Sequence, residues 1–159
     1  MNSTRLVEEF DYHDFHLRGF IVRDFGRSVI LDLISGYGPE RAAFLEFSGV
    51  ESYRFSHTGA AIITYILEVP FLDAVRETGA NFPEEFREHG GLSVAFETNE
   101  EYGQYFEKEG LRTWLIHSAI GFIGMVVGQR LVQAEQVAAA TCSDLPFLNP
   151  TSSARCSEE

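Results

Sequence analysis

The stretch "AAIITYILEV", residues 60–69, decides the fold class of this chain. It is apolar on both faces and rich in Ile, Thr and Tyr, which favour strands over helices. So short a run with this composition is better explained as a central strand than as a buried helix. Pro70 ends it, because proline has no N–H to donate to a neighbouring strand. We therefore predict a β-rich protein with this segment inside its sheet.

Further strands are predicted on the N-terminal side of this segment. Residues 15–24 alternate, with Phe15, Leu17 and Ile21 on one face. The other predicted strands cover residues 28–35 and residues 41–55, the latter bent or broken near Gly49. "FGR" (residues 25–27) and "GYGPE" (residues 36–40) are typical of turns, with Gly26 supplying a positive φ. Four strands in series joined by short turns predict an antiparallel meander.

The helical signals lie in the middle of the chain. Residues 71–90 predict one or two short helical turns, because Gly79, Pro83 and a Gly pair interrupt them. A firm helix is expected near residues 99–109. Thr98 and Glu101 have the spacing of a capping box, and Gly110 suits the left-handed position after the helix.

The C-terminal part returns to strand patterns. Alternation predicts strands over residues 92–97, 111–119 and 122–132. Residues 122–132 are apolar on both faces, so another element or a partner must cover them. Residues 135–159 begin with helix formers and end in Ser, Pro and Thr, which predicts a short helix at most and then a mobile tail. The expected fold is one α+β domain over residues 1–134, mainly antiparallel sheet, built as a curved meander, half-barrel or two-layer sandwich.

The composition restricts the class of partner. Asp and Glu outnumber Lys and Arg by 24 to 12, a formal net charge of −12. This balance argues against a nucleic-acid partner, which requires a basic surface, and permits a basic protein partner or self-association. The chain shows no secretory signal and no apolar stretch long enough to span a bilayer, so no membrane partner is expected. Cys142 and Cys156 lie in a polar segment and are expected to be free thiols in the cytoplasm.

Histidines supply the candidate site residues. "YHDFH" places His13, Asp14 and His16 close together, and a turn at residues 12–14 would let the two imidazoles converge on a metal ion. On a strand, however, His13 and His16 point to opposite faces, and a metal needs further ligands. We therefore expect no metal and interpret Asp14 as a turn residue and His16 as a strand-edge residue.

Three other residues are weaker candidates for ligand binding. His57 lies in a turn-like "SHTG", and His117 lies in an apolar strand next to Ser118, which points the other way. Trp114 belongs to a set of aromatic residues that line either a pocket or, by default, the core.

The sequence carries no motif for phosphate, dinucleotide, zinc or nucleophile chemistry, so we predict no cofactor and favour a protein without enzymatic activity. Two functions stay open. The first is a protein-binding module that uses its acidic surface or a sheet face. The second is a small-molecule-binding protein or hydrolase with an aromatic pocket in a curved sheet.

"FLEFSGVESYRF", residues 44–55, follows an N-terminal His-Asp and a first strand. In this layout residues 13–69 resemble a loose group of small bacterial β-rich proteins of unknown function. Some members of that group look like immunity proteins encoded beside secreted toxins. The resemblance implies a β-meander and a protein partner, and it implies no catalytic residues.

Overall fold

The structure is a computed structural model that describes residues 5–6, 14–37, 41–89 and 95–137. The strands are β1 (Arg5–Leu6), β2 (Phe15–Arg23), β3 (Ser28–Ser35), β4 (Arg41–Ser48), β5 (Ser52–Val69), β6 (Arg112–Gly128) and β7 (Arg130–Val137). The helices are α1 (Phe71–Thr78), α2 (Phe82–His89), α3 (Asn99–Lys108) and the short 3₁₀ helix η1 (Asp24–Gly26). The α+β class, the firm helix and the short helices in residues 71–90 are confirmed.

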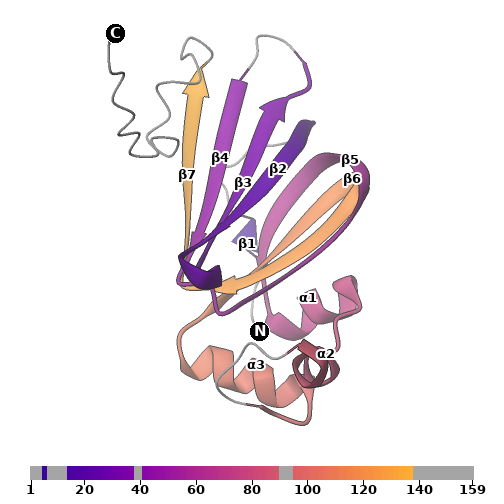
Figure 1. The fold of residues 1–159 in the computed structure, drawn as a ribbon, viewed down its shortest axis with the longest axis vertical. Coiled ribbons are helices and arrows are strands. Elements are labelled where there is room, and N and C mark those ends of the chain that lie inside the picture. The colour runs from indigo at the N-terminus through magenta and orange to yellow at the C-terminus, as the bar shows by residue number, and fades with distance from the viewer. Residues whose placement is uncertain (1–4, 7–13, 38–40, 90–94, 138–159) are drawn as a thin grey trace, which may run out of the picture.

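The strands form one antiparallel sheet that curls into a half-barrel (Figure 1). Its order is β1-β5-β2-β3-β4-β7, and β6 pairs with β5. The predicted meander is correct for β2, β3 and β4. The fourth predicted strand, however, does not follow β4 in the sheet, because β5 pairs with β2 through Phe15↔Ile63 and His16↔Ile62. The strand β5 therefore lies beside the first strand of the meander, and the last strand, β4, pairs with β7.

The corner between β4 and β5 lies where a bend or break near Gly49 is predicted. Residues 41–55 are broken there, since β4 ends at Ser48 and β5 begins at Ser52. Gly49 has a φ of +59°, and the amide of Val50 donates to the carbonyl of Arg27 at 2.9 Å. A second corner lies beside it, where the amide of Gln129 donates to the carbonyl of Ser48 at 3.0 Å between β6 and β7. The corner between β4 and β5 and the corner between β6 and β7 therefore lie side by side, joined through Ser48.

Predicted breaks elsewhere in the sheet are absent. Residues 60–69 continue β5, and residues 112–119 and 122–128 belong to the single strand β6. The predicted strand over residues 122–132 is divided at Gln129, since its last residues lie in β7. The pair bends without separating: His57 opposes Phe122 and Ile62 opposes Ile120, so residues 58–61 face Gly121 alone. The hydroxyl of Ser118 accepts a hydrogen bond from the Phe122 amide at 3.0 Å. A bulge of this kind bends strands while keeping them paired.

Two other expectations fail. Residues 92–94 lie outside the described residues, and residues 95–97 are not in a strand. Phe96 packs instead on the ring of Tyr102, and its amide donates to the Tyr102 hydroxyl at 3.2 Å. The domain limit at Ala134 is also too early, because β7 pairs with β4 as far as Val137. Residues 135–137 are therefore strand rather than helix, and the rest of the predicted tail lies outside the described residues.

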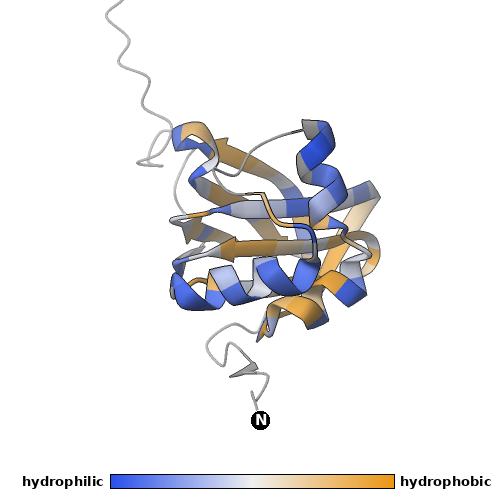
Figure 2. Cartoon of the chain, turned by 90° about the horizontal axis from the view of Figure 1, so that it is seen from below, coloured by the Kyte–Doolittle hydropathy of each residue, from blue (hydrophilic) through white to orange (hydrophobic). Residues whose placement is uncertain are grey.

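Two clusters of buried side chains flank β6. The inner cluster fills the concave face of the sheet and includes Leu31, Phe47, Ile63, Trp114 and Val126. The outer cluster lies between β6 and the helices and includes Phe71, Phe82, Phe106, Leu115 and Met125. Figure 2 shows hydrophobic residues concentrated in the strands and hydrophilic residues along the outward sides of the helices. The two apolar faces of residues 122–128 are thus covered within the chain, and they do not require a partner.

Candidate functional site

The N-terminal candidates lie where β2 begins. His13 is outside the described residues. Asp14 is half-buried in a turn with a φ of +69°, and its carbonyl accepts a hydrogen bond from the Gly36 amide at 3.1 Å. His16 is also half-buried, and its ring covers Gly36 so closely that a Cβ atom there would lie 2.6 Å from its Nε2. The contacts of Asp14 and His16 therefore hold the turn after β3 against the start of β2.

The remaining candidates lie on the β5–β6 pair. His57 is exposed, with its ring 6.0 Å from that of Phe122. The ring of His117 lies 4.6 Å from that of Tyr65, and its carbonyl accepts a hydrogen bond from the Thr64 hydroxyl. Trp114 is only 1% exposed and packs on Phe47 in the inner cluster, with ring centroids 5.5 Å apart.

These contacts leave the candidates dispersed over the sheet. Asp14 and His16 share a turn, whereas the contacts of His57, Trp114 and His117 go to other neighbours. In the described part of the chain, no three His, Cys, Asp or Glu side chains are grouped so as to hold a metal ion. No described helix is long and apolar enough to cross a membrane.

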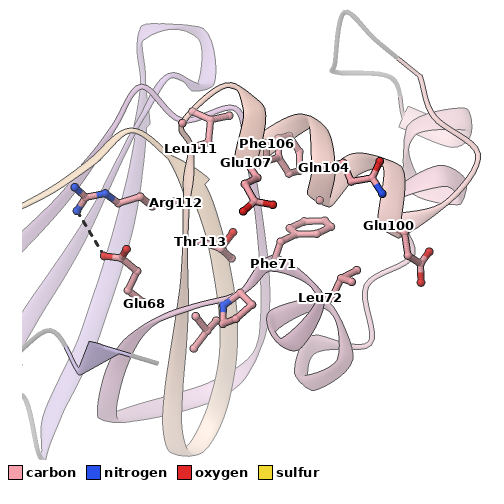
Figure 3. Close-up of a pocket in the computed structure, with 14 residues that line it drawn as sticks. Glu68, Phe71, Leu72, Glu100, Gln104, Phe106, Glu107, Leu111, Arg112 and Thr113 are labelled. Atoms are coloured by element: carbon pink, nitrogen blue, oxygen red, sulfur yellow. Dashed lines mark ion pairs between the residues drawn. The ribbon is translucent and has the colours of Figure 1, made fainter. Parts of the chain in front are cut away.

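A cleft of about 760 Å³ provides a different candidate site (Figure 3). One wall is formed by the end of β5 and the start of α1, and the other by α3 and the start of β6. The apolar lining consists of Val69, Pro70, Phe71, Leu72, Phe106 and Leu111. The polar lining consists of Glu68, Glu100, Gln104, Glu107, Arg112 and Thr113.

The floor of the cleft is made by close contact between α1 and α3. The rings of Phe71 and Phe106 lie edge to face, with centroids 5.1 Å apart. Gly103 eases this approach, since a Cβ atom at this position would lie 3.1 Å from Cδ1 of Phe71 and the ring would have to shift slightly. The glycine weakens α3 as an isolated helix, but it lets the two helices share an apolar surface. Leu72 remains 38% exposed beside them.

The rim of the cleft is acidic. Arg112 pairs with Glu68 across a distance of 3.5 Å, which leaves little net charge at that end. Glu100 and Glu107 are exposed on α3, and neither has an ion pair among the residues that the structure describes. Figure 3 shows both carboxylates on the α3 side of the cleft. The arrangement combines an apolar floor with two carboxylates that have no cationic partner in the part of the chain that the structure describes.

The sequence carries a signal for this site in the spacing of one helix face, which no motif for catalysis or cofactor binding includes. Glu100, Gly103, Gln104 and Glu107 recur at the spacing of one helix face, and all four line the cleft. The pair Glu100-Glu101 is easily interpreted only as helix N-terminal charge. That interpretation is correct for Glu101, whose carboxylate accepts the Thr98 amide at 3.1 Å to complete the capping box. Glu100, one residue earlier, lines the cleft instead.

Comparisons with models of known protein families, with curated proteins and with solved structures found no match to this chain.

Proposed function

We propose that this chain is a non-enzymatic protein-binding module whose cleft takes an apolar segment of a basic partner protein. The observation that carries the proposal is the combination of the Phe71–Phe106 floor with the uncompensated carboxylates of Glu100 and Glu107. Removing apolar surface from water supplies binding free energy. The carboxylates select a segment that carries Lys or Arg. A bound segment without these cations would remove water from the carboxylates and leave them unpaired.

The overall charge supports the same kind of partner. A net charge of −12 raises the rate at which a basic protein reaches the surface, and it repels acidic competitors. The resemblance of residues 13–69 to immunity-like proteins implies a partner of this class, since an immunity protein acts by binding a toxin.

The alternative function, a pocket inside the curved sheet, has less support. Side chains such as Leu31, Phe47 and Trp114 pack together on the concave face. Of the described residues, only Ser28 and Thr113 are polar and fully buried. A small-molecule site is expected to combine an apolar pocket with several convergent polar groups.

The test is direct binding of a probe to the purified chain. The probe is a labelled peptide of leucine and arginine arranged at helical spacing, and its affinity is measured by fluorescence anisotropy. We expect the double variant Glu100→Gln with Glu107→Gln to bind at least about 10-fold more weakly, a loss near 1.4 kcal/mol, because hydrogen bonds to charged groups contribute more than neutral ones. Added salt should weaken binding to the unmodified chain.

The matched control is Glu77→Gln with Glu97→Gln, which removes the same charge at exposed positions outside the cleft lining. This control should bind the peptide nearly as well as the unmodified chain. Equal losses in the two double variants would mean that net charge, and not the cleft, attracts the peptide. No binding by the unmodified chain at low salt would also contradict the proposal.

A further inference from the structure

The half-barrel has an open seam, which we define as the outer edges of β2 residues 18–23 and β5 residues 52–57. Along the whole of β2 the partner is β3, whereas β5 pairs with β2 only at Phe15 and His16. Residues 52–57 pair with β6 on their other side. Among the described residues, neither edge of the seam has a strand partner. Only side chains cross it, with the rings of Phe20 and Phe55 at 5.0 Å.

Exposed apolar side chains gather at the seam. Phe20 and Ile21 are each 41% exposed, Val22 is 39% exposed, and Tyr53 is 39% exposed on the opposite edge. Phe25, at the turn that ends β2, is fully exposed, although its φ of +56° is in the left-handed region that bulky side chains avoid. A strand edge with exposed apolar residues promotes pairing with another chain, and soluble proteins usually block it.

The seam is also the place where the charge of the chain is locally reversed. Residues 18–27 and 52–57 carry four of the 12 basic residues and a single acidic residue, Asp24. Arg18 pairs with Asp32 at 2.7 Å, and Arg54 pairs with Glu85 on α2. Arg27 is exposed, and no ion pair to it is present within the described ranges. Arg27 therefore offers a guanidinium group to an acidic ligand, whereas Arg18 and Arg54 are already paired with carboxylates of the chain.

We propose that the open seam binds an extended segment of another protein in which apolar residues alternate with acidic ones. The segment adds to the outer edge of β2 as a further strand, so the main-chain groups of residues 18–23 gain hydrogen bonds. Its apolar side chains cover Phe20 and Val22, and a carboxylate meets Arg27. A second copy that offered its own β2 edge would bring its own Arg27 with it, so charge favours an acidic partner over self-pairing.

This inference goes beyond the proposed function, because the seam lies on β2 and β5 and shares no residue with the lining of the acidic cleft. It also predicts a ligand of opposite charge. The two proposals therefore fail or succeed separately, and variants of one site serve as controls for the other.

The experiment measures binding of a labelled peptide in which valine alternates with glutamate. We expect binding to the unmodified chain, a loss of at least about 10-fold for Ile21→Glu, and a smaller loss for Arg27→Glu, which lies outside the strand and should not disturb its folding. Val132→Glu is the matched control: Val132 is exposed to a similar extent, at 36%, on β7 at the other side of the sheet. This control and the Glu100→Gln with Glu107→Gln variant should bind normally.

Two further peptides separate strand addition from general attraction. The same peptide with alternate backbone amides methylated should lose binding, since it cannot pair with a strand edge. The version with lysine in place of glutamate should bind much more weakly. Amide hydrogen exchange should slow at residues 19–22 when the first peptide is added.

Several outcomes would overturn the inference: no binding of the glutamate peptide, equal binding of the methylated peptide, or equal losses in Ile21→Glu and Val132→Glu. A concentration-dependent dimer that Ile21→Glu dissociates, together with no peptide binding, would assign the seam to a second copy instead.

Discussion

Gly121 lies directly against the carbonyl group of Ala60: a Cβ atom on Gly121 would stand 2.2 Å from the Ala60 oxygen. The residue also has a φ of +76°, which side chains rarely adopt. It faces residues 58–61 of β5, so one glycine opposes four residues where the strand pair bends. This contact lets β5 and β6 bend while remaining paired.

Gly121→Ala should therefore destabilise the protein strongly. The left-handed conformation alone costs about 1–2 kcal/mol for an alanine, and the backbone clash should add about 1–3 kcal/mol. Gly79→Ala is the matched control, since Gly79 has a φ of +64° but nothing within 4 Å of its Cβ position. Urea unfolding followed by circular dichroism measures both. Similar losses in the two variants would mean that the Ala60 contact has no energetic effect.

Phe25→Gly should leave the protein as stable as it was, or more stable by up to about 1.5 kcal/mol. Glycine removes the strain of the left-handed conformation, about 1–2 kcal/mol, and costs about 0.5–1 kcal/mol through the greater freedom of the unfolded chain. No burial is lost, because Phe25 is fully exposed. Thermal unfolding measures the change.

Phe20→Gly is the comparison for Phe25→Gly. Phe20 lies in β2 and contacts the ring of Phe55, so this variant should lose more than about 1 kcal/mol. A loss greater than about 0.5 kcal/mol in Phe25→Gly would mean that the turn depends on this phenylalanine for folding. The exposure of Phe25 beside the seam would then be explained by folding and not by a partner.

Trp114→Phe should lower stability by about 1–3 kcal/mol without changing the affinity of the leucine–arginine peptide. The smaller ring leaves a void beside Phe47 in the inner cluster. Thr113, the next residue, points to the other side of β6 and lines the cleft. Urea unfolding measures the stability of the variant, and fluorescence anisotropy on the same preparation measures its affinity for the peptide. A weaker peptide affinity in the folded variant would return Trp114 to the set of binding residues.

The expected candidate site differed from the cleft because the sequence search was based on residue chemistry. The histidines and the aspartate near residue 14 are residue types that bind ligands, yet the described contacts of Asp14 and His16 lie within a turn and a strand pair. The cleft depends instead on Phe71 and Phe106, which are far apart in sequence and meet where Gly103 leaves room beside the Phe71 ring. No pattern among neighbouring residues predicts a contact between side chains so far apart in sequence.

The sequence by itself determined the strand pattern, the capping box of Thr98 and Glu101, and the turns at Gly26 and Gly110. Each of these features depends on residues within a few positions of one another. Tertiary structure alone decided how two glycines shape the sheet. Gly49 marks a corner and Gly121 a bend, although both are glycines in apolar strand patterns. The difference lies in their partners, Gln129 and Ala60, which distant parts of the chain supply. Pairing register, the cleft and the open seam are non-local in the same way, so they exist only once β5 has paired with both β2 and β6.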